Sequence, residues 1–162
     1  MAQSQHLILA SASPRRLELL QQVGLEPERL LPADIDEAQH GSEHPRSLAK
    51  RLSQGKAEAA VAVLERLQER AGRFVLAADT VVCVGRQVMP KAELIEDAHA
   101  NLRILSGRTH RVYTGVCVIG PSGRLRQRLV ETRVRFKRLT RQDMDQYLSL
   151  IHISEPTRLR RI

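Results

Sequence analysis

The feature that most constrains the fold is an almost continuous apolar run at residues 74–84, Phe-Val-Leu-Ala-Ala-Asp-Thr-Val-Val-Cys-Val. Such a run is typical of a strand covered on both faces, as found in sheets with helices on either side. Asp79 interrupts it with a carboxylate, and an unpaired buried charge is costly. The run therefore predicts an α/β fold. It makes Asp79 a candidate metal ligand or general base, and a structural carboxylate that caps nearby backbone is an equally good interpretation.

The rest of the sequence alternates between strand and helix patterns. Further strands are predicted over residues 7–10, 110–119 and from the turn at 120–123 to about 138, and helices over 14–23, 45–72 and 93–105 and from Thr140, which opens a capping-box pattern. A chain of 162 residues with 42% hydrophobic residues is large enough for one buried core. We therefore expect a single domain over residues 1–147.

The first strand and the first helix meet at a turn, Ser11-Ala12-Ser13-Pro14-Arg15-Arg16. Ser13 suits the N-cap position and Pro14 the first helical position, so backbone N–H groups and the helix dipole would point at one spot. Such a spot attracts an anion, for which phosphate is the best match, and guanidinium groups suit phosphate oxygens better than lysine does. These residues alone fit a phosphate site and a capped surface helix equally well.

The composition narrows the choice of partners. The chain has 26 lysines and arginines against 18 aspartates and glutamates, and its net charge of +8 suits a polyanion. Aromatic residues make up only 2% and the basic residues are scattered, so a nucleic-acid groove is not favoured over a highly charged small molecule. No stretch approaches the ~20 apolar residues that cross a bilayer. Cys83 and Cys117 lie in apolar runs typical of buried thiols, and we expect a cytoplasmic protein without a membrane partner.

Short motifs follow one another in a fixed order. They are Ala10-Ser11-Ala12-Ser13-Pro14-Arg15-Arg16, Asp36-Glu37, Arg51-Leu52, Lys56-Ala57, Ala78-Asp79-Thr80-Val81-Val82, Lys91, Leu105-Ser106-Gly107, His110 and Thr114-Gly115-Val116. Over about residues 7–147 they resemble the motifs of the Maf family, nucleoside triphosphate pyrophosphatases historically linked to septum formation. The resemblance implies a Maf/inosine triphosphatase-like α/β fold, with a mixed sheet, flanking helices and a cleft between two lobes, usually in a homodimer.

The resemblance also implies an activity and a set of site residues. The reaction would be hydrolysis of dTTP, UTP or modified pyrimidine nucleotides to the monophosphate and pyrophosphate, with Mg²⁺ or Mn²⁺ as cofactor. Asp79 would be the catalytic carboxylate and general base, and Glu37 and Asp79 would hold the metal. The residues that match triphosphate contacts are Ser11, Ser13, Arg16, Lys56 and Lys91, and those that match specificity positions are Arg15 and Thr80. The alternative is a non-catalytic nucleotide- or nucleic-acid-binding regulator of cell division.

The last residues, Leu148 to Ile162, resemble the translation of a transposase-type sequencing adapter followed by a sample index. A non-native segment of this kind is excluded from fold reasoning. We therefore expect the natural domain to be interrupted near Tyr147, with one specificity motif of the family lost. Without residues 148–162, which carry three arginines and one glutamate, the net charge is +6. Such a domain is expected to be poorly stable or inactive, because part of the sheet and one wall of the cleft would be uncovered.

Overall fold

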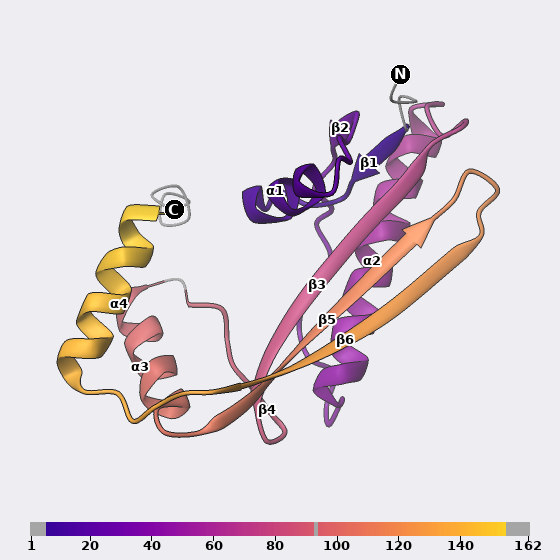
Figure 1. Cartoon of the computed structure of the whole chain (residues 1–162). Helices are drawn as coiled ribbons and strands as arrows, with labels where there is room; N and C mark the ends of the chain where they lie inside the picture. The colour runs from indigo at the N-terminus through magenta and orange to yellow at the C-terminus, as the bar shows by residue number, and fades with distance from the viewer. Residues whose placement is uncertain (1–5, 93, 155–162) are drawn as a thin grey trace. The chain divides into compact units, whose positions relative to one another are not determined.

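The computed structural model describes residues 6–92 and 94–154. Its elements are β1 (Leu7–Leu9), α1 (Pro14–Gln22), β2 (Arg29–Leu30), α2 (Pro45–Arg66), β3 (Phe74–Val84), β4 (Gln87–Val88), α3 (Ile95–Leu105), β5 (Thr109–Ile119), β6 (Leu125–Arg135) and α4 (Arg141–Ser154) (Figure 1). The strands form a six-stranded sheet in the order β2-β1-β3-β5-β6, with β4 paired to β3. Because β1 is parallel to β2 and β3 whereas β4 is antiparallel to β3, the sheet is mixed. The predicted α/β class is confirmed.

The chain divides into two compact units. The first comprises Met1–Val81 and Tyr113–Val130 and contains β1, β2, α1 and α2. The second comprises Val82–Val112 and Glu131–Ile162 and contains β4, α3 and α4. The cleft expected between two lobes stays a prediction. Among the described residues, no helix combines the length and the apolar character needed to cross a membrane.

The core of the first unit forms where α2 packs on the sheet. Its buried members are Ile8, Ala10, Ala57, Ala60, Leu64, Val75, Ala77, Cys117 and Ile119. In β3, buried residues alternate with partly exposed ones because successive side chains point to opposite faces of a sheet. The prediction that both faces of this strand are covered is therefore confirmed only in part: one face is buried on α2, whereas the other is partly covered and starts with Phe74, which is 46% exposed.

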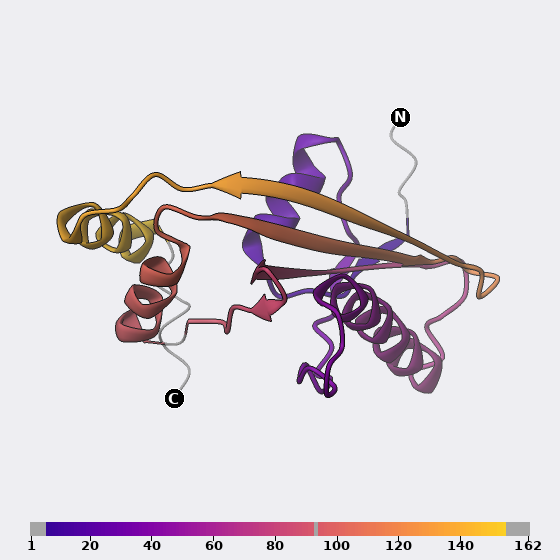
Figure 2. The same ribbon diagram turned by 90° about the horizontal axis from the view of Figure 1, so that it is seen from below.

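The helices of the first unit lie on opposite faces of the sheet (Figure 2). α1 connects β1 to β2, and α2 connects β2 past β1 to β3, so the two crossovers run in opposite directions. Because crossovers between parallel strands are right-handed, opposite directions place the helices on opposite faces. Between β1 and β3, the direction in which successive connections run across the sheet therefore reverses, although the two strands are parallel. In open α/β sheets, ligands bind in the crevice at the carboxyl ends of the strands beside such a reversal.

The ends of α2 illustrate which boundaries the sequence can predict. The helix starts at Pro45 as expected, with His44 as the N-cap. It stops at Arg66 and not near Gly72, because Gln68 adopts a left-handed φ of 58°. The amides of Gln68 and Glu69 then donate to the carbonyls of Glu65 and Leu64, which is the Schellman arrangement. The residue with a left-handed φ at the end of a helix is usually glycine, so the glutamine at position 68 did not indicate in the sequence that the helix ends here.

A close approach of β5 to α2 requires glycine at position 115. A Cβ added to Gly115 would lie 2.2 Å from the carbonyl oxygen of Ala49 and 2.7 Å from Ser53 Oγ. We expect Gly115→Ala to lower the free energy of unfolding by about 1–3 kcal/mol or more, because the helix backbone must move away. Denaturant unfolding measures the loss. Gly120→Ala is the matched control, since its Cβ would make only ordinary contacts, with the Phe74 ring at 3.6 Å and the Arg124 carbonyl oxygen at 3.7 Å; equal stability of the two variants would contradict the prediction.

The predicted capping box at the start of α4 is confirmed. The amide of Thr140 donates to Asp143 Oδ2 at 2.8 Å, and the amide of Asp143 donates to Thr140 Oγ1 at 3.1 Å. The backbone hydrogen bond from Thr140, together with the hydrogen bond from Lys137, lowers the pKa of Asp143 from 3.8 to about 2. A lowered pKa stabilises the ionised form in the folded state.

This cap predicts an acid-dependent contribution to the helix. Because the folded pKa is depressed, the stabilisation by Asp143 is fully present above the ordinary pKa of 3.8 and is lost as the pH falls through about 2. Far-UV circular dichroism of the chain and of Asp143→Ala should therefore differ at neutral pH and converge in strong acid. A helicity difference that persists unchanged to the lowest pH would refute this role of the carboxylate.

Candidate functional site

A buried lysine joins two carboxylates in the first unit. Lys56 Nζ lies 2.7 Å from Glu37 Oε1 and donates a hydrogen bond to Asp79 Oδ1. The side chains of Lys56 and Asp79 are 10% and 4% exposed, whereas that of Glu37 is 37% exposed. With all three groups ionised the cluster has a net charge of −1, so it can attract a further cation.

The alternation of β3 places Asp79 in this cluster. Its side chain lies on the buried face of the strand, with Val81, and so faces α2 and Lys56. The ammonium group of Lys56 compensates the charge of this buried carboxylate. Thr80 lies on the opposite face, where its hydroxyl is 3.2 Å from that of Thr114.

A glycine in α2 brings Glu37 to the lysine. The Cδ1 atom of Ile35 lies so close to the helix that a Cβ at Gly55 would be only 3.2 Å from it. Glycine inside a helix costs roughly 1 kcal/mol relative to alanine, so its place here is explained by this contact. The segment after Ile35 therefore runs along α2 at the turn that carries Lys56, and Glu37 reaches the ammonium group.

The turn after β1 is organised around the hydroxyl of Ser11. Ser11 Oγ, in a buried residue, accepts hydrogen bonds from Arg16 Nη1 at 3.1 Å and from the Ser13 amide at 3.2 Å. Ser13 is the N-cap residue and Pro14 the first helical residue, as predicted. The expected cap bond from the Ser13 side chain is absent in this described turn, because the amide of Arg16 donates instead to the Ser13 carbonyl at 3.1 Å.

The strand register brings this turn beside the strand that carries Asp79. Leu9 of β1 pairs with Leu76 of β3, and the amide of Ala10 donates to the Leu76 carbonyl at 2.8 Å. The turn at Ser11 therefore begins alongside the residues that lead to Asp79. Both groups lie beside the point in the sheet where the direction of the connections reverses, which is where a ligand is expected.

The structure brings some of the predicted site residues together and separates others. Glu37, Lys56 and Asp79 meet directly, and Ser11 bonds Arg16. Lys91 is exposed and belongs to the second unit, so its contact with the same ligand stays a prediction. The sequence analysis assigned no role to Thr114, the neighbour of Thr80, because no spacing rule connects residues 34 positions apart on different strands.

Two carboxylates are the candidate metal ligands. Among residues 6–92 and 94–154, no group of three or more His, Cys, Asp or Glu side chains is arranged to hold a metal ion. Glu37 and Asp79 nevertheless converge on one cation, the ammonium group of Lys56. Mg²⁺ is commonly bound through one or two carboxylates together with water and substrate phosphates. The pair therefore fits a metal that arrives with a phosphorylated ligand.

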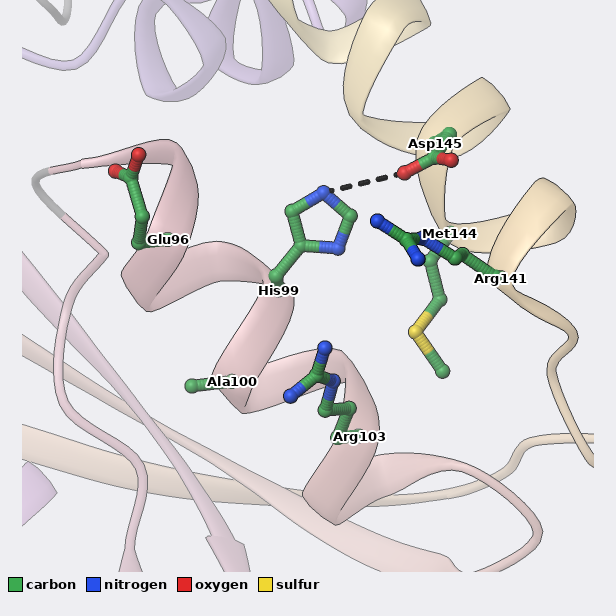
Figure 3. A pocket seen from close by; sticks show the side chains of 7 residues that line it. All are labelled: Glu96, His99, Ala100, Arg103, Arg141, Met144 and Asp145. Atoms are coloured by element: carbon green, nitrogen blue, oxygen red, sulfur yellow. Dashed lines mark ion pairs between the residues drawn. The ribbon is translucent and has the colours of Figure 1, made fainter.

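A separate pocket of about 400 Å³ lies in the second unit, between α3 and α4 (Figure 3). It is lined by Glu96, His99, Ala100, Arg103, Arg141, Met144 and Asp145. His99 Nε2 lies 3.3 Å from Asp145 Oδ1 across it. None of the predicted site residues lines this pocket.

Comparison with known proteins identifies the family. The family model described as Maf-like protein matches residues 6–154. The chain belongs to the Maf-like protein family. This agrees with the family indicated by the sequence motifs, and the match includes residues 148–154, for which the non-native origin stays a prediction.

Two relatives of this Maf-like protein are named dTTP/UTP pyrophosphatase. The Mesorhizobium japonicum protein is 63% identical over 145 residues, which cover 90% of this chain and 70% of that protein. The Rhizobium meliloti protein is 55% identical over 149 residues, which cover 92% and 72%. Among solved structures, the Staphylococcus aureus Ham1 protein is similar with a TM-score of 0.54 and 14% identity, over 80% of this chain and 70% of that one. The similarity to Ham1 concerns the fold alone.

Proposed function

We propose that this Maf-like protein is a nucleoside triphosphate pyrophosphatase that converts dTTP, UTP or modified pyrimidine nucleotides to the monophosphate and pyrophosphate. The observation that carries the proposal is the convergence of Glu37 and Asp79 on Lys56 beside the Ser11 turn. Relatives that are 55% and 63% identical are named for activity on dTTP and UTP, which supports the choice of substrates.

In the proposed reaction, Asp79 accepts a proton from water as the water oxygen attacks the α-phosphorus. The bond from the α-phosphorus to the bridging oxygen breaks, and pyrophosphate leaves with the bonding electrons. Positive side chains and hydroxyl donors stabilise the charge that builds on the phosphate oxygens. The residues proposed to do so are Ser11, Ser13, Arg16, Lys56 and Lys91.

A divalent metal, Mg²⁺ or Mn²⁺, is part of the proposal. When bound, it would neutralise part of the triphosphate charge and so favour attack on phosphorus. Glu37 and Asp79 are its proposed ligands, because they already converge on one cation. Lys56 then has two proposed roles. It balances the charge of the carboxylates, and it donates a hydrogen bond to a phosphate that binds together with the metal.

The proposed specificity residues lie on the other face of the sheet. Thr80 lies on the face of β3 opposite Asp79, and its hydroxyl is 3.2 Å from that of Thr114. Arg15 is an exposed residue of α1. Two hydroxyls and a guanidinium group can read the polar edge of a base by hydrogen bonds. Arg16, a proposed triphosphate contact, follows Arg15 in α1, so we propose that Arg15 and Thr80 contact the base of a nucleotide whose phosphates are held beside them.

The test is an assay of pyrophosphate release from a panel of nucleoside triphosphates with Mg²⁺ or Mn²⁺. Residues 1–147 should be joined to the C-terminal segment of the M. japonicum relative, and the 162-residue chain compared in parallel. We expect metal-dependent release that is fastest with dTTP and UTP. Binding of nucleotide without release would favour a non-catalytic regulator. Salt-sensitive binding of nucleic acid that survives Asp79→Asn would favour a nucleic-acid module.

The proposal places the enzyme in the cytoplasm as a homodimer. Two buried free thiols, Cys83 and Cys117, suit a reducing compartment. Burial raises the pKa of the Cys117 thiol to about 11, which keeps it protonated and unreactive. The homodimer rests on the family resemblance, and light scattering of the extended protein tests it.

A further inference from the structure

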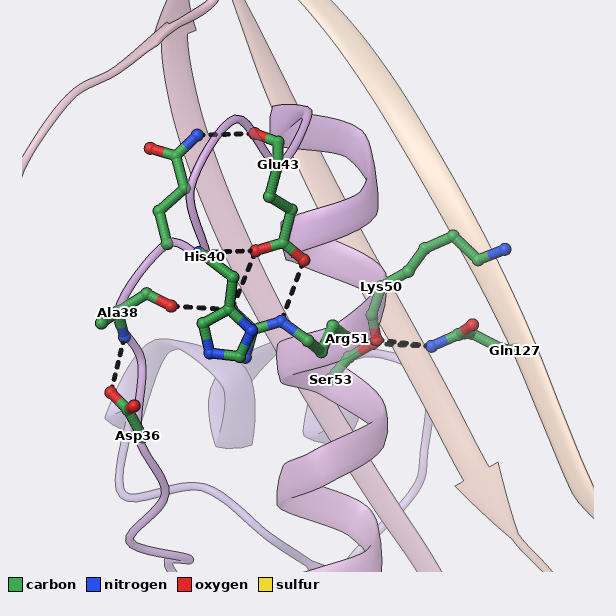
Figure 4. A network of polar contacts seen from close by, with 9 residues as sticks. Asp36, Ala38, His40, Glu43, Lys50, Arg51, Ser53 and Gln127 are labelled. Carbon is green, nitrogen blue, oxygen red and sulfur yellow. Dashed lines mark hydrogen bonds and ion pairs between the residues drawn. The ribbon is translucent and has the colours of Figure 1, made fainter.

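One guanidinium group holds the segment that carries Glu37 against α2 (Figure 4). Arg51 Nε donates to Glu43 Oε1 at 2.9 Å, and Arg51 Nη2 donates to Glu43 Oε2 at 2.9 Å. The same Nη2 donates to the carbonyl of Ala38 at 2.7 Å. Arg51 therefore binds the segment at two residues on the C-terminal side of Glu37, Ala38 and Glu43.

The segment is also tied to itself on either side of Glu37. The amide of Ala38 donates to Asp36 Oδ1 at 2.9 Å, and the amide of His40 donates to Glu43 Oε2 at 3.2 Å. Glu37 thus lies between Asp36 and Ala38, which are bonded to each other. Because Arg51 holds Ala38, the backbone on both sides of Glu37 is fixed relative to the helix.

The chemistry of the Arg51 contacts suits a rigid support. A two-pronged hydrogen bond between guanidinium and carboxylate is stronger and more directional than one between neutral groups. The hydrogen bond from Arg51 lowers the pKa of Glu43, and the hydrogen bond to Glu43 raises the pKa of Arg51. Both groups are therefore ionised at neutral pH. Lysine keeps the charge but cannot offer this planar pair of donors.

We infer that Arg51 is a positioning residue that sets Glu37 as a metal ligand, acting through Ala38 and Glu43. This inference rests on the proposed function, because it takes Glu37 as one of the two ligands. Residues that orient a ligand commonly change metal affinity 10- to 100-fold when they are replaced. A residue that merely stabilises the fold changes the melting temperature and leaves the affinity of the folded protein unchanged.

The test measures Mn²⁺ binding to the 162-residue chain by calorimetry in the presence of a non-hydrolysable dTTP analogue, together with amide hydrogen exchange over residues 34–44 and thermal unfolding. Arg51→Lys is the main variant, and Glu43→Gln, which keeps the shape of the partner, is the milder second one. Arg46→Lys is the matched control, because Arg46 is exposed on the same helix. Glu37→Gln reports the contribution of the ligand itself.

We expect Arg51→Lys and Glu43→Gln to raise the Mn²⁺ dissociation constant about 10-fold or more and to speed exchange at residues 36–43. Arg46→Lys should change neither. If Glu37→Gln weakened Mn²⁺ binding but Arg51→Lys and Glu43→Gln left it unchanged, the positioning role would be overturned and the proposed function would stand. Unchanged binding by Glu37→Gln would overturn the metal assignment of the proposed function, and the positioning role with it.

Discussion

Replacing Asp79 by asparagine is expected to reduce pyrophosphate release from dTTP by about 10²–10⁴-fold in the protein extended by the relative's C-terminal segment. A general base contributes about this much, and an amide cannot accept the proton at neutral pH. Asparagine has the size of aspartate, and its carbonyl oxygen can still accept the hydrogen bond that Lys56 donates at this position. Because Glu37 still balances the charge of Lys56 in this variant, the fold should persist while the chemistry fails. Steady-state kinetics with dTTP, together with a thermal melt of each protein, measures both.

Asp34→Asn is the matched control for this prediction. Asp34 is an exposed residue of the segment that leads to Glu37, so the same chemical change there should leave the turnover number and the melting temperature near those of the parent. If Asp79→Asn retained turnover close to that of Asp34→Asn, Asp79 would not be the base. The thermal melt distinguishes a loss of turnover caused by unfolding from one caused by removal of the base.

The parts of the site that the sequence could predict are those with a local signal. Asp79 stood out because a carboxylate is unusual within an apolar strand, and the turn after β1 stood out because Ser13 and Pro14 are helix-starting residues. These signals need only neighbouring residues. They identified the candidate charge, but not the residue that balances it.

The contacts that assemble the site depend on tertiary structure. Lys56 and Asp79 are 23 residues apart, and they meet only because α2 crosses back over the face of β3 on which the carboxylate lies. Strand β2 escaped prediction for a similar reason: two residues, Arg29 and Leu30, form a strand only through parallel pairing with β1. The sequence does not show which residues of the helix face the sheet, so it cannot distinguish Lys56 from a solvent-exposed lysine.

Lys56→Met should produce the largest loss of stability. We expect the free energy of unfolding to fall by about 3–5 kcal/mol, because removal of one partner of a buried ion pair leaves the other charge uncompensated. Asp79 is 4% exposed and cannot recover this energy from water. Domains are stable by only about 5–15 kcal/mol, so the variant should be close to its unfolding threshold. Denaturant unfolding of Lys56→Met and of the parent chain gives the difference.

The same variant separates a structural ion pair from a cation site. Without the ammonium group, Glu37 and Asp79 are free to take another cation, so Mn²⁺ should raise the melting temperature of Lys56→Met more than that of the parent, by linkage between binding and folding. Lys50→Met is the control, since Lys50 is an exposed lysine of the same helix. Equal stability of the two methionine variants would show that the buried pair does not stabilise the fold. A destabilised Lys56→Met that Mn²⁺ fails to rescue would show that the two carboxylates balance a lysine and do not bind a metal.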